Sequence, residues 1–266
     1  MIRDVWAEHA AYEAYIGRWS RRVAAAFVPR LGVPPGRRWL DVGCGTGSLA
    51  AAVVATAEPS EVVGVDPSLG FLAGATATAG AVFCAGDARA LPFPDDTFDA
   101  VVSGLALNFV PDPARAAAEL ARVARPGAVV AAYVWDHADG MRMLRHFWDA
   151  ASEVDAGAAA MDEGRRFALC RPEPLADLWH GAGLPAATVA AVDVPTVFAD
   201  FDDYWQPFLG GQGPAPGFVA ALPEDRRAAL RELLRSRLPT HDDGSIRLTA
   251  RAWAVQGVKA GSRTPG

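Results

Sequence analysis

The segment Asp41-Val42-Gly43-Cys44-Gly45-Thr46-Gly47-Ser48 decides the fold of this chain. It follows the apolar pair Trp39-Leu40 and leads into residues 49–57, which are rich in Ala, Val and Leu. The order predicts a strand, a tight glycine turn and a helix. Glycines at such a turn have no side chains to hold a ligand away from the backbone. The segment therefore predicts a ligand site where the first strand meets the following helix.

Apolar runs with helical segments between them continue on the C-terminal side of this turn. Asp112 and Pro113 are typical of a helix start, and Arg125-Pro126-Gly127 of its end. Residues 128–135 are almost continuously apolar, as in a strand covered on both faces. The predicted strands are 39–42, 61–65, 81–84, 98–103 and 128–135. This alternation predicts an α/β protein with a doubly wound, Rossmann-like sheet and helices on both faces.

The remaining segments extend this core without an internal repeat, so we expect one domain over residues 1–266. Residues 12–28 have aromatic and apolar side chains at four-residue intervals and are interpreted as an N-terminal lid helix. Helices are expected at 141–154, 173–180 and 224–238, and strands at 187–198 and 246–255. Roughly 45 residues separate the last two strands, far more than a turn needs. We therefore expect a cap insertion at 199–240 beside a cofactor-binding core at 38–135.

Composition excludes several classes of function. The chain has 266 residues, 31 of them acidic and 25 basic, and a net charge of −6, which argues against nucleic-acid binding. Two uncharged stretches, at 67–86 and 204–223, are interrupted by Gly, Thr or Pro, so no membrane span is expected. Cys44, Cys84 and Cys170 are too few and too far apart for a disulfide framework or a metal site. A cytoplasmic protein without a metal is the prediction.

Three carboxylates close successive strands, and strand ends converge on the ligand crevice of an open α/β sheet. Asp66 is placed to accept both ribose hydroxyl hydrogens, and Asp87 could accept from the exocyclic amine of adenine. Asp41 lies where a dinucleotide would place its pyrophosphate, which a carboxylate would repel, so a cationic group is favoured there. The spacing Gly43-x-Gly45-x-Gly47 also differs from the G-x-G-x-x-G of dinucleotide folds. The ligand is predicted to be an adenosine with a positive substituent, which describes S-adenosylmethionine.

The segment from Trp39 to Trp135 resembles the class I S-adenosylmethionine-dependent methyltransferases. Within that class it is similar to the bacterial ubiquinone/menaquinone-biosynthesis-like (methyltransferase type 11) branch. The matching stretches are Leu40-Asp41-Val42-Gly43-Cys44-Gly45-Thr46-Gly47, Gly64-Val65-Asp66-Pro67-Ser68, Gly86-Asp87-Ala88-Arg89-Ala90-Leu91-Pro92-Phe93, Phe98-Asp99-Ala100-Val101-Val102-Ser103 and Arg125-Pro126-Gly127.

The resemblance implies a seven-stranded sheet, parallel in its first five strands and ending in an antiparallel hairpin. It also implies S-adenosyl-L-methionine as cofactor, S-adenosyl-L-homocysteine as product and a small-molecule methyl acceptor. The cofactor residues implied are Asp41, Gly43, Cys44, Gly45, Gly47, Asp66, Pro67, Asp87, Ala88, Ser103 and Gly104. Where the family often has His-His or Asn-His, this chain has Leu107-Asn108-Phe109, so no histidine role is carried over to that position.

The acceptor side of the site is less defined, and no catalytic residue is assigned. A sulfonium is already activated, so positioning the reactants for in-line displacement can suffice. His137 and His146 are candidate general bases by position, and a structural role is the more common one for a single histidine. Candidate acceptor residues are Tyr15, Trp19, Asn108, His137, Trp205 and Phe208, although aromatic residues at helical spacing more often form core.

Two other functions remain open at this point. The chain could be a cofactor-binding scaffold or regulatory subunit without turnover. It could also be a nicotinamide-dependent oxidoreductase, which the glycine spacing and Asp41 both disfavour. The sequence does not define the oligomeric state or the atom that is methylated.

Overall fold

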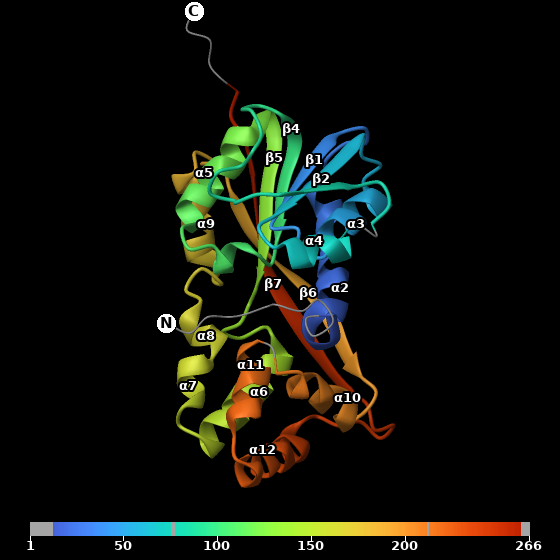
Figure 1. The fold of residues 1–266 in the computed structure, drawn as a ribbon, viewed down its shortest axis with the longest axis vertical. Coiled ribbons are helices and arrows are strands. Elements are labelled where there is room, and N and C mark those ends of the chain that lie inside the picture. The colour runs from blue at the N-terminus through green and yellow to red at the C-terminus, as the bar shows by residue number, and fades with distance from the viewer. Residues whose placement is uncertain (1–12, 76–77, 212, 262–266) are drawn as a thin grey trace, which may run out of the picture. The chain divides into compact units, whose positions relative to one another are not determined.

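The computed structural model describes residues 13–75, 78–211 and 213–261 (Figure 1). The chain divides into two compact units, and each is described separately here. The sheet unit comprises Ser20–Val134, Leu169–Val192 and Trp253–Gly266. The aromatic unit comprises Met1–Trp19, Trp135–Ala168 and Asp193–Ala252.

A seven-stranded sheet has the strand order β3-β2-β1-β4-β5-β7-β6. The strands are β1 (Arg38–Val42), β2 (Glu61–Asp66), β3 (Val82–Ala85), β4 (Phe98–Gly104), β5 (Ala124–Trp135), β6 (Thr188–Phe198) and β7 (Ile246–Val258). The first five strands pair in parallel. Next to β7, the Gly127 amide donates to the Lys259 carbonyl and the Lys259 amide to the Ala128 carbonyl, the pattern of an antiparallel pair with a bulge at Gly127. The predicted seven-stranded, mostly parallel sheet with an antiparallel end is confirmed.

The order of the strands shows where the winding direction of the sheet changes. From β1 the chain steps outward through β2 to β3, and it then returns to the other side of β1 to form β4 and β5. Ligands of open α/β sheets bind beyond the carboxyl ends of the strands where the winding direction changes. That point lies between β1 and β4, where Asp41 pairs with Val102.

Helices lie between and after the parallel strands of the sheet unit along the chain. They are α3 (Ser48–Thr56), α4 (Leu69–Ala75), α5 (Pro113–Val123) and α9 (Pro172–Gly181). The Asp112 carboxylate accepts from the Arg115 amide, and Pro113 begins the helix, so the predicted start of α5 is confirmed. Helix α3 packs on β2, α4 on β3 and α5 on α9. Central strand residues such as Val101 and Ala131 are fully buried.

One segment differs from its expected conformation. Arg125-Pro126-Gly127 was expected as a turn after a helix, whereas β5 already begins at Ala124. Its register explains the difference, because Phe98 pairs with Ala124 but Ala100 pairs with Val129. The intervening residues form an irregularity in the ladder, which accommodates the proline and Gly127 with its φ of 82°.

The aromatic unit consists mainly of helices around a core of stacked rings. Its helices are α6 (Arg142–Val154), α7 (Ala158–Met161), α8 (Glu163–Arg166), α10 (Phe201–Trp205), α11 (Pro214–Ala221) and α12 (Glu224–Arg237). The rings of Phe147 and Phe208 stack at 4.5 Å, and the Tyr204 hydroxyl donates to the Met143 carbonyl at 2.9 Å. Pro214 lies in the first turn of α11, where its missing N–H is not needed.

The segment 12–28, predicted to be a lid helix, is helical from residue 13, and Tyr12 lies outside the described residues. It begins as a π-helical turn, Glu13–Gly17, and continues as α2 (Arg18–Phe27). Among the described residues, no helix has the length and apolar character needed to cross a membrane. None of Cys44, Cys84 and Cys170, all within the described residues, is part of a disulfide.

Candidate cofactor site

The glycine turn after β1 is fastened to the end of β2. The amides of Gly43 and Cys44 donate to the Val65 carbonyl at 2.8 and 3.1 Å, and the Gly45 amide donates to Asp66 Oδ2 at 2.9 Å. These N–H groups therefore fix the turn to its neighbouring strand. Gly43 has a φ of 72°, and a Cβ atom there would collide with the Ala106 side chain. Only glycine combines this left-handed conformation with so close an approach.

Asp66 ends β2 and is oriented by two backbone donors. Its Oδ1 accepts from the Ser68 amide at 2.8 Å, and its Oδ2 accepts from the Gly45 amide at 2.9 Å. Each carboxylate oxygen can accept more than one hydrogen bond, so both retain acceptor capacity. Burial raises the pKa of Asp66, and the hydrogen bonds from Ser68 and Gly45 oppose that rise. The carboxylate is thus held rigidly next to the glycine turn, as a ribose acceptor would need to be.

Asp41 is the most buried carboxylate of the site. Its Oδ2 accepts from the Ala50 amide in the first turn of α3 at 3.0 Å, while its Oδ1 is buried without a hydrogen-bond partner. Burial raises the pKa of Asp41 to about 7, the Ala50 hydrogen bond lowers it, and the negative charge of Asp66 raises it further. A buried carboxylate with one unsatisfied oxygen is costly unless a donor or a positive charge meets it. This observation fits a cationic ligand and not a pyrophosphate.

Two further polar side chains at the end of β4 have unsatisfied atoms. Ser103 Oγ and Asn108 Nδ2 are both buried and lack hydrogen-bond partners. Ser103 directly follows the residue that pairs with Asp41, and Asn108 lies in the short 3-10 helix Leu107–Phe109. Most buried polar atoms in proteins are hydrogen-bonded, so these two exceptions need an explanation. A bound polar ligand would supply the missing partners.

Asp87 follows β3 and has a different environment. The Arg89 side chain binds both of its oxygens, with Nη2 to Oδ2 at 2.6 Å, and the Arg89 amide donates to Oδ1 at 2.9 Å. These hydrogen bonds lower the pKa of Asp87 to about 2. Asp87 is therefore an ionised, half-exposed carboxylate that already has a cationic partner. An adenine amine would share its oxygens with Arg89.

The other predicted cofactor residues lie on the same elements. Gly47 is the N-terminal cap of α3, Pro67 follows Asp66 on the surface, and Ala88 follows Asp87. At the end of β4, a Cβ atom on Gly104 would lie 2.6 Å from the Tyr133 hydroxyl oxygen. Burial raises the pKa of the Cys44 thiol, and Asp41 and Asp66 add to the rise, which supports a filler role and not a nucleophile.

The two candidate general bases lie in the aromatic unit. Burial lowers the pKa of His137 to about 3, and the positive charges of Arg145 and Arg166 add to the effect. Burial is also the main cause that lowers the pKa of His146. A general base works best with a pKa near the working pH. His137 is therefore poorly tuned for proton abstraction, although its Nδ1 is buried without a hydrogen-bond partner.

The four aromatic acceptor candidates form part of the core of the aromatic unit. Tyr15, Trp19, Trp205 and Phe208 are all at most 4% exposed. Tyr15 meets Phe208 edge-on at 5.7 Å, and Trp19 meets Phe198 at 5.3 Å. These contacts support the core interpretation of these residues, and a role in acceptor binding stays a prediction. The structure thus gathers the predicted cofactor residues and Asn108 in the sheet unit, and places the other acceptor candidates in the aromatic unit.

Several residues that shape the site carry no signal in the sequence. Ala106 limits residue 43 to glycine, and Tyr133 occupies the space beside Gly104. Ala50 satisfies one oxygen of Asp41 through its backbone amide. All three act through tertiary contacts. Ala106 acts through its Cβ atom and Ala50 through its backbone amide, which most residue types have, so no sequence motif marks these positions.

The fold and the site have three features in common with one class of enzyme. The strand order is 3-2-1-4-5-7-6, a glycine turn follows β1, and a buried carboxylate ends β2. Residues 40–132 match the family model described as a methyltransferase domain. These residues form a class I, S-adenosylmethionine-dependent methyltransferase domain, as the sequence resemblance predicted.

Two methyltransferases of known name are similar to parts of this chain. The chain is 33% identical over 187 residues to 2-methyl-6-phytyl-1,4-hydroquinone methyltransferase of Synechocystis sp., covering 68% of this chain and 57% of that protein. It is 40% identical over 126 residues to demethylmenaquinone methyltransferase of Renibacterium salmoninarum, covering 45% of this chain and 48% of that protein. The chain therefore spans about half the length of the curated relatives it matches.

A solved structure supports the fold over nearly the whole chain. The phosphoethanolamine N-methyltransferase 2 of Haemonchus contortus, in a complex with S-adenosylhomocysteine, superposes with a TM-score of 0.59. The match has 19% sequence identity and covers 95% of this chain and 57% of that chain. At this identity the likeness concerns the fold alone.

Proposed function

We propose that this protein transfers the methyl group of S-adenosyl-L-methionine to a small-molecule acceptor by in-line displacement. The observation that carries the proposal is the pair of buried carboxylates around the glycine turn. Asp66 is held by the Gly45 and Ser68 amides with acceptor capacity left, and Asp41 has an unsatisfied oxygen that favours a cation. The match of residues 40–132 to a methyltransferase domain supports the same reaction.

When bound, the cofactor supplies an electrophilic methyl group on a positively charged sulfur. The residues of this chain bind and orient it. Asp66 accepts from the ribose hydroxyls, and the space beside Gly45 is open because this residue has no side chain. The negative charge of Asp41 favours the cationic end of the cofactor over its neutral product. Ser103 and Asn108 offer polar atoms at the end of β4.

In this proposal the rate acceleration comes mainly from positioning. Holding two reactants in line can supply about 7 to 11 kcal/mol of the barrier, so a dedicated base is not required. The depressed pKa of His137 is consistent with this mechanism. Residues 12–28 and 199–240 are proposed to act as lid and cap and to determine which acceptor is used.

We further propose an apolar or aromatic acceptor. The two curated relatives are named for a phytyl hydroquinone and for demethylmenaquinone, and both names denote apolar ring compounds. The excess of acidic over basic residues does not favour a nucleic-acid acceptor. Free thiols at all three cysteines support a reducing, cytoplasmic location.

Calorimetric titration with S-adenosylmethionine, S-adenosylhomocysteine and NAD tests the cofactor. We expect the first two to bind and NAD not to bind, and binding of NAD alone would refute the proposal. Transfer of label from methyl-labelled S-adenosylmethionine to a panel of hydroquinones, phenols and amines then tests the reaction. Binding of the cofactor with no transfer to any acceptor would favour the scaffold alternative.

A further inference from the structure

One face of helix α5 carries a row of charged side chains directed at a single loop. The loop spans residues 86–97 and connects β3 to β4, and it contains Asp87 and Ala88. Arg115, Glu119 and Arg122 are spaced four and three residues apart, which places them on one side of the helix. All three side chains bind the backbone of this loop.

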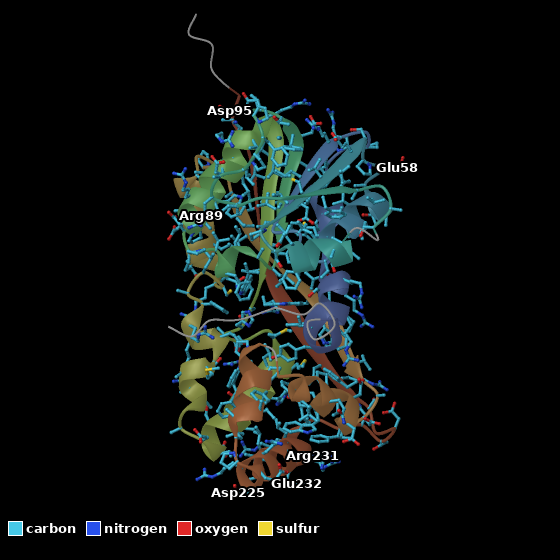
Figure 2. All side chains as sticks on the ribbon, viewed as in Figure 1. Glu58, Arg89, Asp95, Asp225, Arg231 and Glu232 are labelled. Atoms are coloured by element: carbon cyan, nitrogen blue, oxygen red, sulfur yellow. The ribbon has the colours of Figure 1, made fainter. Side chains whose placement is uncertain are left out.

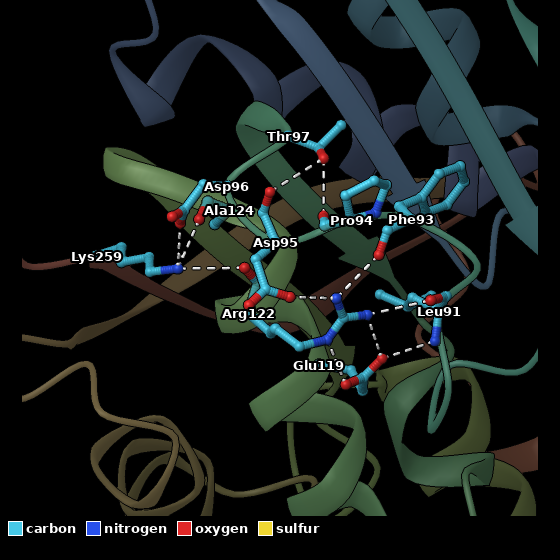
Figure 3. A network of polar contacts seen from close by, with 10 residues as sticks. All are labelled: Leu91, Phe93, Pro94, Asp95, Asp96, Thr97, Glu119, Arg122, Ala124 and Lys259. Carbon is cyan, nitrogen blue, oxygen red and sulfur yellow. Dashed lines mark hydrogen bonds and ion pairs between the residues drawn. The ribbon is translucent and has the colours of Figure 1, made fainter.

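The middle of the loop is held most firmly (Figure 3). Glu119 Oε2 accepts from the Leu91 amide at 2.8 Å, and Arg122 Nη2 donates to the Leu91 carbonyl at 3.1 Å. Arg122 Nη1 donates to the Phe93 carbonyl at 2.9 Å. Arg122 and Glu119 also pair in bidentate form, with both N···O distances at 2.7 Å. One ion pair thus satisfies both backbone groups of Leu91 and one of Phe93.

The near end of the loop is fastened by the next charged residue on the same face. Arg115 Nε donates to the Arg89 carbonyl at 2.8 Å. The Arg89 side chain and amide in turn bind Asp87. A continuous chain of contacts therefore runs from α5 through Arg89 to the carboxylate that ends β3. Figure 2 shows Arg89 and Asp95 on the side of the sheet unit that carries α5.

The far end of the loop is anchored as well. Arg122 Nη1 pairs with Asp95 at 2.7 Å, and Lys259 Nζ pairs with Asp96 at 2.7 Å. Asp96 has a φ of 54°, in the left-handed region that few residues other than Gly, Asn and Asp adopt. The surrounding bonds thus determine the path of the loop although it contains no helix and only an isolated bridge between Asp87 and Ala90.

A loop fixed in advance binds a ligand more tightly, because the entropy of ordering it has already been lost on folding. We infer that Arg115, Glu119 and Arg122 are positioning residues that set the place of Asp87 and Ala88 and thereby the recognition of the adenine base. This inference rests on the proposed function, because it assumes that these two residues meet the adenine of the cofactor.

If Arg115, Glu119 and Arg122 had only a structural role, their replacement would have a different result. It would change the stability of the sheet unit and leave the preference for adenine over other purines unchanged. A positioning role changes discrimination at the 6-position of the purine. There, adenine offers an amine that donates to Asp87, while hypoxanthine offers a carbonyl oxygen that a carboxylate repels.

The test compares the affinities of the full-length protein for S-adenosylhomocysteine and S-inosylhomocysteine by calorimetry. The variants are Glu119→Gln, which removes the charge that holds Arg122, and Arg115→Ala, which lies on the exposed side and should not disturb folding. Glu61→Gln is the matched control, because Glu61 also pairs with an arginine, Arg38, in the sheet unit and does not touch the loop.

We expect Glu119→Gln to bind S-adenosylhomocysteine about three- to tenfold more weakly and to lose a similar factor in its preference for adenine over hypoxanthine. Arg115→Ala should show a smaller change in the same direction, and Glu61→Gln should behave like the wild type. Unchanged affinity and preference in both loop variants would overturn the positioning role alone. If the wild type binds neither ligand, the proposed function fails first and this inference fails with it.

Discussion

Replacing Asp41 by asparagine should stabilise the folded protein above neutral pH and weaken its binding of the cationic cofactor. Asparagine has nearly the shape of aspartate and can keep an oxygen on the Ala50 amide, which Asp41 Oδ2 contacts at 3.0 Å. The substitution removes the negative charge of a residue that is only 1% exposed. One oxygen of this carboxylate, Oδ1, has no hydrogen-bond partner. Comparison of the variant with the wild type therefore measures how much this charge lowers the free energy of unfolding.

The magnitude follows from the pKa of the buried carboxyl. The difference between the ordinary value of 3.8 and the value of about 7 in the folded state corresponds to about 4 kcal/mol. Because the pKa is raised on folding, the folded state binds the proton more tightly than the unfolded chain. The contribution of Asp41 to the stability of the wild type is therefore most favourable below about pH 4, and it falls as the pH rises to about 7. The asparagine does not titrate, so the variant loses no stability by this route.

Urea unfolding of both proteins between about pH 4 and pH 8 measures the effect. The free energy of unfolding of Asp41→Asn relative to wild type should increase by about 4 kcal/mol across this range, with other groups cancelling. Asp225→Asn, at an exposed position on α12, controls for the substitution itself. A relative stability that does not depend on pH would refute the claim that Asp41 is buried as a strained charge.

Three further changes test other parts of the site. Asp66→Ala should weaken S-adenosylhomocysteine binding by about 1 to 3 kcal/mol in calorimetry, and unchanged affinity in the folded variant would contradict the ribose role. Gly43→Ala should lower the free energy of unfolding by about 1 to 3 kcal/mol, because its φ is 72° and its methyl group would meet Ala106. Adding Ala106→Gly should recover only part of that loss in denaturant titrations, and full recovery would show that backbone strain is unimportant. His137→Asn should leave the shape of the pH–rate profile between about pH 5 and 8 unchanged, because His137 is uncharged there, and the loss of an acidic limb would show that it titrates during turnover.

Local sequence specified most of the sheet unit. The glycine turn, the strand-end carboxylates and the Asp112-Pro113 helix start each combine a residue type with a short spacing, and such signals depend on few neighbours. They predicted the strand-helix alternation that the sheet confirms, and a cofactor site that stays a prediction. The conformation of residues 125–127 was missed because a register irregularity between β4 and β5 outweighed the local turn signal.

The properties of the site depended on tertiary contacts instead. The sequence placed Asp41 and Asp66 at strand ends, but only the fold shows that one oxygen of Asp41 lacks a partner and that Asp66 is fixed by the Gly45 and Ser68 amides. Periodicity likewise does not distinguish a packed ring from a ligand-facing one, and Trp19 and Phe208 proved to be buried against other rings. Hydrogen-bond partners and burial are properties of groups that are distant in the chain. They arise only when folding brings those groups together.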